Sequence, residues 1–301
     1  MTTSGKLASA LALALTLAAA RTTTAMAEDA VKCGMCEEWN QPQQPFQIVG
    51  NTYYVGPRGL SAVLLTSEQG HILLDGALPQ SAPLIIRSIA ALGFRIEDVK
   101  LIVNSHAHDD HAGGIATLQR ASGATVAASA AGAQALRAGL VGPDDPLYKA
   151  NGPDRFPRVA QVTEVADGAI LRVGPLAIQA HLTPGHTTGG TTWTWQSCEH
   201  KRCLDVVYAD SLNPISHDGF RFSGSASMPE RVRSFRASID KVASLKCDVL
   251  IAVHPGFADL MEKQAARTAA SNPFIDPGAC RAYAANAGQR LNRRLASEAL
   301  Q

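Results

Sequence analysis

Residues 104–114 read NSHAHDDHAGG, so three histidines and two aspartates fall within six positions, 106 to 111. Imidazole nitrogens and carboxylate oxygens are ligands that zinc prefers in proteins. The stretch begins at the C-terminal end of VKLIVNS, residues 99–105, whose apolar run predicts a buried strand. The sequence therefore predicts a metal site where a strand gives way to a loop, and it leaves open which of Asp109 and Asp110 is the ligand.

Two later histidines share this setting. TPGHT at 183–187 and VHPGF at 253–257 each place a histidine beside a glycine or proline turn after a strand-like segment. Strand ends are where open α/β sheets gather their ligand sites. The three segments supply five histidines and one aspartate as ligands, which is enough for two zinc ions with three protein ligands each and one open position.

Strand-like and helix-like segments alternate along the rest of the chain. Short runs rich in Val, Ile and Leu, separated by turn residues, predict the first strands: FQIVG, TYYVG, SAVLLTS and HILLDG. A helix is expected over PQSAPLIIRSIAALGF, with Gly93 as its stop signal. The second half repeats the order of strands followed by helices, so we predict an α/β fold with two sheets face to face and helices outside.

The N-terminus has the layout of a secretory signal peptide over residues 1–27. Lys6 precedes an apolar stretch that ends at Ala20, and small residues flank a cleavage point before Glu28. A membrane anchor is the alternative, but the apolar stretch is shorter than the roughly 20 residues that a spanning helix needs. We therefore expect residues 28–301 to form a single catalytic domain that is exported to the periplasm.

Charge and composition favour a small substrate. The formal net charge is +1 and no run of like charges is present, so nothing predicts binding to nucleic acid or to a membrane. We expect a monomer. Residues 141–158 hold four prolines without apolar periodicity, which indicates a long surface loop of the kind that often serves a function.

Six cysteines in an exported chain make disulfides available. Cys198 and Cys203 bracket a short polar loop and could staple a hairpin tip, and Cys247 could pair with Cys280 on a C-terminal helix. Cys33 and Cys36 form a CxxC, which suggests a redox or zinc site. No strand and helix surround it, so a local disulfide or a pair of loosely structured thiols is preferred.

Longer phrases give the chain a family resemblance. With its HxHxDH motif and two later histidines, it resembles the metallo-β-lactamase superfamily. The segments most similar to secreted subclass B3 metallo-β-lactamases are GNTYYVG, LSAVLL, GHILLDG, HAGGI, TPGHTTGGTTWTW, VYADSL and the stretch from Cys247 to Cys280. The resemblance covers essentially the whole chain after the signal peptide, and it implies the αββα four-layer sandwich of the metallo-β-lactamase fold.

The resemblance also implies two Zn²⁺ ions per chain and assigns their ligands. The first ion would be held by His106, His108 and His186, and the second by Asp110, His111 and His254. Ser211 stands where another subclass has a cysteine ligand, and it would contact a zinc-bound water or the substrate carboxylate. The next contact position, usually Ser or Thr, is Asn213 here, so the preference among β-lactams stays open.

The implied activity is hydrolysis of the β-lactam amide of penicillins, cephalosporins and carbapenems, which confers antibiotic resistance. A zinc-bound hydroxide would attack the carbonyl without a protein base. Asp110 would be both a ligand and the acceptor that orients the hydroxide, which makes it the nearest to a catalytic side chain. Asp109 is expected to face solvent, and Gly113 and Gly114 to let the next helix approach closely.

Other polar and aromatic residues receive structural interpretations. The remaining histidines are assigned to turns, loops or strands: His71, His181, His200 and His217. Trp193 and Trp195 alternate with threonines and are expected on one packed face. Asp210 could be read as a seventh ligand, because an aspartate bridges both metals in many hydrolases of this fold. We instead expect it to lie outside the ligand set, next to the ligands and without direct contact to a metal. Tyr148 and Phe156 either wall the substrate cleft or lie exposed in the loop.

Two other functions remain as alternatives. A glyoxalase-II-like thioesterase or a lactonase would use the same metal site, and fold alone does not separate these activities. A non-catalytic zinc-binding protein would require a site closed by protein ligands, whereas three ligands per ion leave one position open. The expected signal peptide and Ser211 favour the lactamase.

Overall fold

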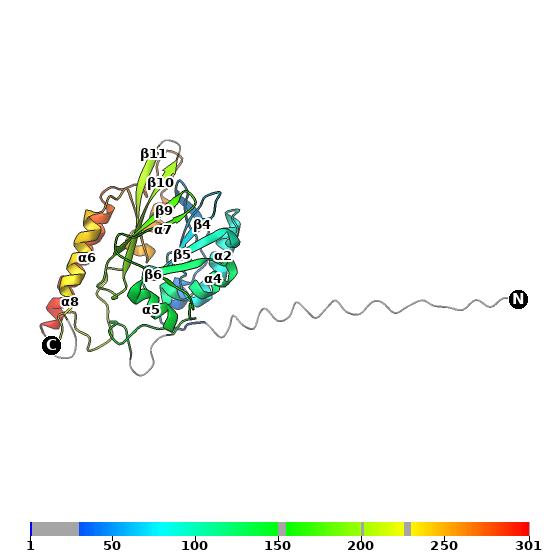
Figure 1. Cartoon of the computed structure of the whole chain (residues 1–301). Coiled ribbons are helices and arrows are strands. Elements are labelled where there is room, and N and C mark those ends of the chain that lie inside the picture. Colours follow the sequence, from blue (N-terminus) through cyan, green and yellow to red (C-terminus); the bar gives the residue numbers. More distant parts are fainter. Residues whose placement is uncertain (2–29, 150–154, 200–201, 226–229, 301) are drawn as a thin grey trace.

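The protein is described by a computed structural model that covers residues 1, 30–149, 155–199, 202–225 and 230–300. The segment predicted to be a signal peptide, apart from Met1, and His200 lie outside these residues. Two mixed β-sheets pack face to face, and helices cover the outer face of each sheet (Figure 1). The predicted αββα sandwich is therefore confirmed.

The first sheet has seven strands in the order of the sequence. They are β1 (Phe46–Val49), β2 (Thr52–Tyr54), β3 (Val63–Leu65), β4 (His71–Leu74), β5 (Val99–Val103), β6 (Thr125–Ser129) and β7 (Thr163–Val165). The first four strands form an antiparallel meander, and the pairings from β4 to β7 are parallel. Because β4, β5 and β6 run in the same direction, their carboxyl ends lie at one edge of the sheet.

The second sheet has five strands in the order β12-β11-β10-β9-β8. They are β8 (Ile170–Val173), β9 (Leu176–Leu182), β10 (Thr191–Glu199), β11 (Arg202–Ala209) and β12 (Val249–Ala252). The neighbours from β8 to β11 are antiparallel, and β12 runs parallel to β11. The sequence predicted these strands, but it did not predict the three-residue β7 of the first sheet.

Helices form the two outer layers, and short helices also connect strands at the ends of the sheets. They are α1 (Cys36–Trp39), η1 (Pro79–Ser81), α2 (Ala82–Ala91), η2 (Ile96–Asp98), α3 (Asp109–Ala112), α4 (Ile115–Ser122), α5 (Ala130–Ala138), α6 (Val232–Ser244), η3 (Pro255–Phe257), α7 (Leu260–Ala265) and α8 (Ala279–Glu298). In Figure 1, α6 and α8 lie side by side over the second sheet, while α2 and α4 lie on the opposite side of the molecule. Gly123 and Gly139, both at φ 71°, end α4 and α5 in the left-handed conformation that favours glycine.

Alternation along the strands separates two hydrophobic cores. In β3, Val63 and Leu65 belong to the core between the sheets, whereas Leu64 belongs to the core beneath α2, α4 and α5. Side chains alternate between the two faces of a strand, so a strand buried on both faces reads as a continuous apolar run. Trp193 and Trp195 lie on the inner face of β10, are 0% and 5% exposed, and are packed as expected.

Three disulfides link the six cysteines. Cys198–Cys203 joins β10 to β11, and Cys247–Cys280 joins the segment just before β12 to α8, as the sequence suggested. Cys33–Cys36 closes a four-residue loop that ends at the first residue of α1, so of the two preferred interpretations the local disulfide holds. All three are bonds that persist in oxidising compartments.

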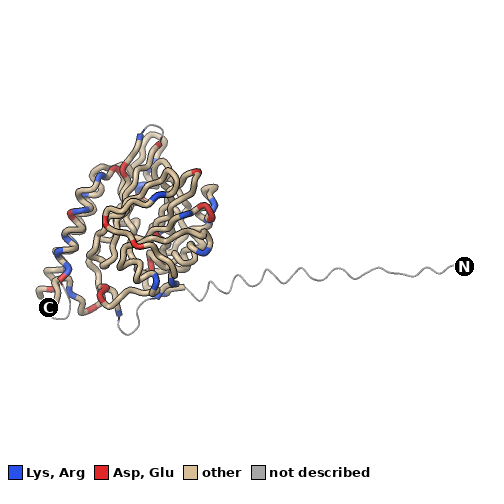
Figure 2. Tube along the Cα trace, in the orientation of Figure 1, with Lys and Arg blue, Asp and Glu red and all other residues tan. Residues whose placement is uncertain are grey.

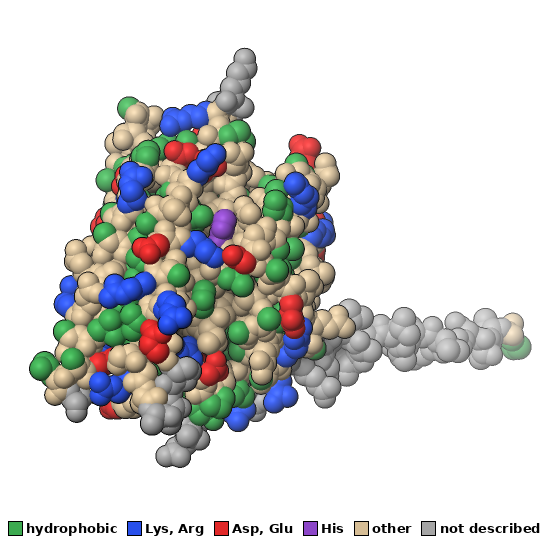
Figure 3. All heavy atoms as spheres, turned by 60° about the vertical axis from the view of Figure 1, so that its left-hand side comes forward, with side chains coloured by type: hydrophobic (Ala, Val, Ile, Leu, Met, Phe, Trp, Pro, Cys, Tyr) green, Lys and Arg blue, Asp and Glu red, His purple; other side chains and the backbone are tan. Residues whose placement is uncertain are grey.

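The surface carries mixed charge. Figure 2 shows acidic and basic residues interspersed along the described chain, and on the face seen in Figure 3 they alternate with apolar side chains rather than gathering by type. Among the residues that the structure describes, no helix combines the length and apolar character needed to span a membrane.

Candidate metal centre

Three segments far apart in the sequence meet at the carboxyl ends of strands. His106 and His108 follow β5, Asp110 and His111 lie in the one-turn helix α3, and His186 lies between β9 and β10. His254 follows β12. The fold thus brings all six predicted metal ligands together at one edge of the sandwich, where sheets of this kind gather their ligands.

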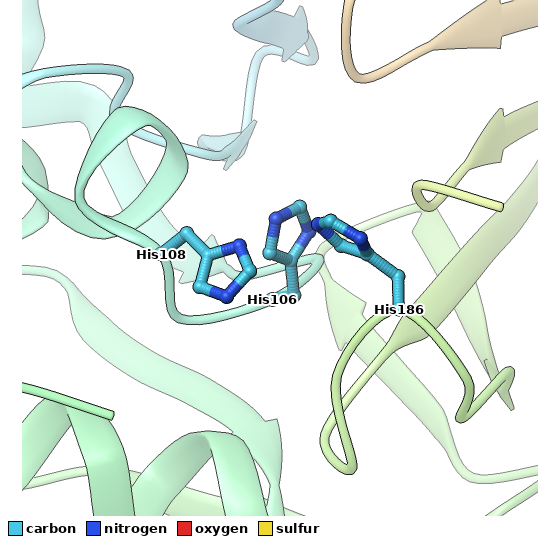
Figure 4. Close-up of side chains that lie close together, drawn as sticks. All are labelled: His106, His108 and His186. Carbon is cyan, nitrogen blue, oxygen red and sulfur yellow. The ribbon is translucent and has the colours of Figure 1, made fainter. Parts of the chain in front are cut away.

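The first group consists of His106, His108 and His186. One ring nitrogen from each lies within 4.8 Å of the others, and all three side chains are buried. Figure 4 shows the three imidazole rings turned toward one another, two from the loop after β5 and one from the loop before β10. Three buried imidazoles with no hydrophobic role are the donor set that zinc prefers.

Each of the three rings has a hydrogen-bond partner outside this group of histidines, which we call its outer partner. This partner determines which ring nitrogen is left to bind a metal. Nδ1 of His186 lies 2.8 Å from the backbone oxygen of Asn213. A carbonyl oxygen only accepts, so Nδ1 must carry the proton and Nε2 is left with a lone pair. Nδ1 of His106 likewise lies 2.6 Å from Oδ1 of Asp210, and Nε2 of His108 lies 2.9 Å from Oδ1 of Asp145. Metal-binding histidines almost always have such partners.

His106 provides a direct test of whether a metal fits. Its Nε2 is completely buried and has no hydrogen-bond partner among the described residues. A buried polar atom without a partner costs about 1 to 3 kcal/mol. Because Nδ1 is already engaged by Asp210, a cation bound to Nε2 satisfies the ring, and the residues present therefore fit zinc.

The second group consists of Asp110, His111 and His254. Oδ2 of Asp110 lies 3.4 Å from Nε2 of His111 and 3.3 Å from Nε2 of His254, and the two nitrogens are 3.2 Å apart. Ligand atoms at zinc distances of about 2.0–2.1 Å and tetrahedral angles would be about 3.3–3.4 Å from one another. This triangle has the edge lengths of one face of a tetrahedral zinc site.

The two groups share a border at His106. A nitrogen of this residue also lies within 4.8 Å of ligand atoms of Asp110 and His111. We place His106 in the first group, as the family resemblance implies, because His254 completes the second group in a triangle of 3.2 to 3.4 Å. The two sites are therefore neighbours, as two ions sharing one bound water require.

Burial and charge hold three of the ligands in the protonation states that bind a cation. Burial, with the neighbouring His111, His186 and His108, holds the pKa of His106 well below its usual range. Burial lowers the pKa of His186 to about 3. Burial acts against ionised Asp110, but His111 and His254 outweigh it and hold the pKa of that carboxyl well below its usual range. At neutral pH these groups are in the states that bind zinc.

A further aspartate supports the site. Asp75 is fully buried at the end of β4, adopts a φ of 58°, and accepts hydrogen bonds from Ser105 N at 2.7 Å and Tyr208 OH at 2.8 Å. Its Oδ2 is 3.8 Å from Nδ1 of His111. A non-glycine residue at positive φ is strained and persists where its surroundings hold it, often at functional sites.

The sequence reasoning missed Asp75 and Asp145. Asp75 ends the strand HILLD, so its position at a strand end was a usable signal. Asp145 lies in the proline-rich loop and had no local signal. Asp210, in contrast, was predicted to lie outside the ligand set. Its fully buried side chain contacts Nδ1 of His106.

A cavity of about 980 Å³ opens over the two groups. Ser211 and Asn213 line it, and so does Phe156 of the proline-rich loop, whereas Tyr148 is not among the lining residues. Asp109 is half-buried and borders the cavity, rather than facing bulk solvent as expected. The N-terminal arm, residues 31–41, forms part of the wall, and Trp39 packs 5.3 Å from the ring of His254.

The other described histidines lie away from the metal groups. Nδ1 of His71, at the start of β4, accepts a hydrogen bond from Ser67 N. His181 on β9 contacts Thr194, and His217 lies in a loop. Gly114 fits the prediction of close approach, because a Cβ there would collide with the backbone of Gly76.

Comparisons with known proteins agree with this geometry. The model of the Metallo-beta-lactamase superfamily matches residues 55–254. The structure is similar to the Rm3 metallo-beta-lactamase, with 53% identity, a TM-score of 0.86 and coverage of 89% of this chain and 99% of that one. It is also similar to MEM-A1, a subclass B3 metallo-beta-lactamase from a soil metagenome library, with 52% identity, a TM-score of 0.84 and coverage of 87% and 99%.

This chain belongs to the metallo-beta-lactamase superfamily and, within it, to subclass B3. More distant similarity extends to the hydroxyacylglutathione hydrolase of Bradyrhizobium sp. (strain ORS 278), at 26% identity over 154 residues. That match covers 48% of this chain and 50% of the hydrolase, so the chain matches about half the length of this curated relative.

Proposed function

We propose that this chain is a zinc-dependent β-lactamase that opens the β-lactam amide of penicillins, cephalosporins and carbapenems and so confers antibiotic resistance. The observation that carries the proposal is the pair of adjacent ligand groups at the base of an open cavity. Similarity to Rm3 and MEM-A1 over nearly their whole lengths supports the substrate class.

In this proposal each zinc ion has three protein ligands. The first is bound by His106, His108 and His186, and the second by Asp110, His111 and His254. When bound, two zinc ions would acidify a water molecule to near neutral pKa and polarise the amide carbonyl. Three ligands per ion leave room for water and substrate, which a purely structural zinc site would not.

Asp110 is the side chain nearest to catalysis in this account. Its carboxylate is ionised, because His111 and His254 hold its pKa low despite burial. An ionised carboxylate only accepts hydrogen bonds, so Asp110 can orient the attacking water by accepting one of its protons. Asp109 lies next to it on the cavity wall without belonging to either ligand group.

Ser211 and Asn213 are the proposed contacts for the substrate carboxylate. Both line the cavity beside His186 and His254. The backbone oxygen of Asn213 is occupied by His186, so the side-chain amide is the group available to the substrate. A hydroxyl and an amide can each donate a hydrogen bond to a carboxylate.

The cavity has room for a bicyclic drug with side chains. Its volume of about 980 Å³ is at the upper end of typical small-molecule sites, about 300 to 1,000 Å³. Apolar side chains from three separate segments border it, including Trp39, Leu147, Phe156 and Phe257. These surfaces can pack against the variable side chains of the substrate, while the ligand groups hold the amide.

A thioesterase or lactonase is the second candidate, and the similarity to a hydroxyacylglutathione hydrolase favours it. One feature of the site argues against it. In many hydrolases of this fold an aspartate bridges both metals, whereas Asp210 is directed at the outer nitrogen of His106. Neither group of ligand atoms includes Asp210. The lactamase is therefore the better supported function.

A substrate comparison separates the two candidates. Zinc-loaded protein is assayed for kcat/KM with a chromogenic cephalosporin, a glutathione thioester and a lactone. The proposal predicts that the cephalosporin has the highest kcat/KM. Preferential turnover of the thioester or the lactone would assign the other activity.

We further propose that residues 28–301 form one exported, monomeric catalytic domain and that residues 1–27 are removed. Three disulfides support an oxidising compartment. Mass spectrometry of protein from the periplasmic fraction tests this, with an N-terminus at Glu28 as the expected result. An intact Met1 would refute cleavage, and light scattering gives the number of chains in the particle.

A further inference from the structure

The three histidines of the first group each have an outer partner, but these partners come from two different segments of the chain. Asp210 directly follows β11, and Asn213 is three residues further along the same segment. Asp145, the partner of His108, lies instead in the proline-rich loop between α5 and β7. His108 is therefore the ligand whose orientation depends on the proline-rich loop.

The loop holds Asp145 firmly. The residue is 4% exposed, and its Oδ1 accepts both from Nε2 of His108 at 2.9 Å and from the backbone N–H of Leu147 at 2.8 Å. Its own N–H donates to Gly142 O at 3.0 Å, and its backbone oxygen accepts from Tyr148 N at 3.0 Å. The carboxylate is thus fixed by a tight turn on one side and directed at the ring of His108 on the other.

Two contacts fasten this turn to the rest of the protein. Arg231, 8% exposed and just before α6, donates from Nη2 to the backbone oxygen of Asp144. The backbone N–H of His217 donates to Pro146 O at 2.8 Å. The carboxylate of Asp145 is therefore anchored through its backbone neighbours to the second half of the chain.

The same loop borders the substrate cavity. Val141 and Leu147, on either side of Asp145, are lining residues of the cavity above the ligand groups. Leu147 donates its backbone N–H to the very oxygen that His108 contacts. A single carboxylate oxygen therefore joins a wall of the cavity to a metal ligand.

We propose that Asp145 is a positioning residue that couples the loop of residues 141–149 to zinc binding by His108. The inference rests on the proposed role of His108 as a ligand of the first zinc. With Nε2–H donated to Asp145, the ring presents Nδ1 to the metal in one fixed orientation. By linkage, zinc at this site stabilises the loop to the same extent that the ordered loop strengthens zinc binding.

Asp145→Ala tests this inference with zinc affinity as the readout. Zinc binding to the full protein is measured by competition with a chromophoric chelator, which yields two binding steps for the wild-type chain. Loss of an outer partner of a metal ligand costs about 10- to 100-fold in affinity. We expect Asp145→Ala to weaken one step by that factor and to leave the other unchanged.

Asp144→Ala is the matched control. Asp144 is the adjacent carboxylate, 59% exposed, and its contact with Arg231 through the backbone oxygen survives the substitution. We expect wild-type zinc affinity for this variant. Asp145→Asn retains an oxygen acceptor without the charge and should fall between wild type and Asp145→Ala, which keeps the test informative if the alanine variant folds poorly.

Hydrogen exchange adds a readout that a purely structural role would not change. Zinc should slow amide exchange in residues 141–149 of the wild type and of Asp144→Ala, and should have no such effect in Asp145→Ala. Equal zinc affinity in the two alanine variants, with equal zinc-dependent protection, would overturn the inference. Failure of the wild type to bind zinc would refute the proposed function instead.

Discussion

The carboxylate of Asp210 lies 2.6 Å from Nδ1 of His106, and both side chains are completely or almost completely buried. The pair leaves Nε2 of His106 as a buried atom without a partner among the described residues. Burial raises the pKa of Asp210 well above its usual range. A cation bound to His106 would favour the ionised carboxylate of Asp210 and so lower this pKa again. The Asp210–His106 pair and the metal would therefore stabilise one another.

Asp210→Asn should weaken zinc binding more than it weakens folding. The asparagine amide retains an oxygen that can accept the hydrogen bond from Nδ1 of His106. It carries no negative charge, however, so it does not increase the basicity of the His106 imidazole. We expect zinc affinity to fall about 10- to 100-fold, as is typical for an outer partner of a histidine ligand. The exposed Asp240→Asn on α6 is the control. Unchanged zinc affinity in Asp210→Asn would show that Asp210 only fills space.

Replacing the two neighbouring aspartates separates their roles. Asp110→Ala removes a ligand of the second zinc, so we expect a loss of zinc affinity beyond the roughly 10- to 100-fold typical of outer partners. Turnover should be abolished. Asp109→Ala should have only a mild effect, because Asp109 belongs to neither group of ligand atoms. Equal losses of zinc and activity in the two variants would show that the wrong aspartate has been assigned.

Removal of zinc should destabilise the folded protein. The ligand side chains are mostly buried, and without a cation the Nε2 atom of His106 has no partner within the described part of the chain. A ligand that binds only the native state stabilises it by about 2.7 kcal/mol at 100 times its Kd. Thermal unfolding in chelator should therefore give a lower Tm than unfolding with excess zinc, and identical Tm values would contradict zinc binding to the native state.

Glu298 gives a prediction for the dependence of stability on pH. Its carboxylate accepts from Phe222 N at 2.9 Å, Ser223 N at 3.0 Å and Arg294 Nε at 2.7 Å. Burial acts to raise its pKa, but these hydrogen bonds outweigh burial and lower it. A lowered pKa in the folded state stabilises the protein above the unfolded value of about 4.3, and this contribution is lost as the pH falls through the folded pKa.

Glu298→Gln should therefore lower the free energy of unfolding by about 1 to 3 kcal/mol at pH 7, the range for hydrogen bonds to charged groups. The difference from wild type should shrink below about pH 4. Both proteins are measured without zinc, so that metal loss at low pH does not interfere. The surface pair of Glu164 with Arg137 supplies the control, because Glu164→Gln should cost less than about 1 kcal/mol at any pH. A pH-independent difference for Glu298→Gln would contradict this assignment.

The layered fold and the ligand groups were predictable because their signals are local. HAHDDH, PGHT and VHPGF each stand at the end of an apolar strand, and a sheet brings such ends to one edge. Continuous apolar runs such as Leu101–Val103 indicated strands buried on both faces, which a sandwich covered by helices requires.

The outer partners were less predictable because they depend on tertiary contacts. Asp145 lies in a loop without periodicity, and 37 residues separate it from His108. The strand β7 has three residues, two of them exposed, so it lacks the apolar run by which the other strands were found. The half-burial of Asp109 follows from the cavity wall, which no local pattern encodes.

Ring opening of a carbapenem by protein of known zinc content tests the central claim most directly. Purified protein loaded with two zinc ions per chain should hydrolyse the β-lactam amide, lose this activity in chelator and recover it when zinc is restored. Absence of hydrolysis of a carbapenem and of a cephalosporin by protein that holds both zinc ions would contradict the account.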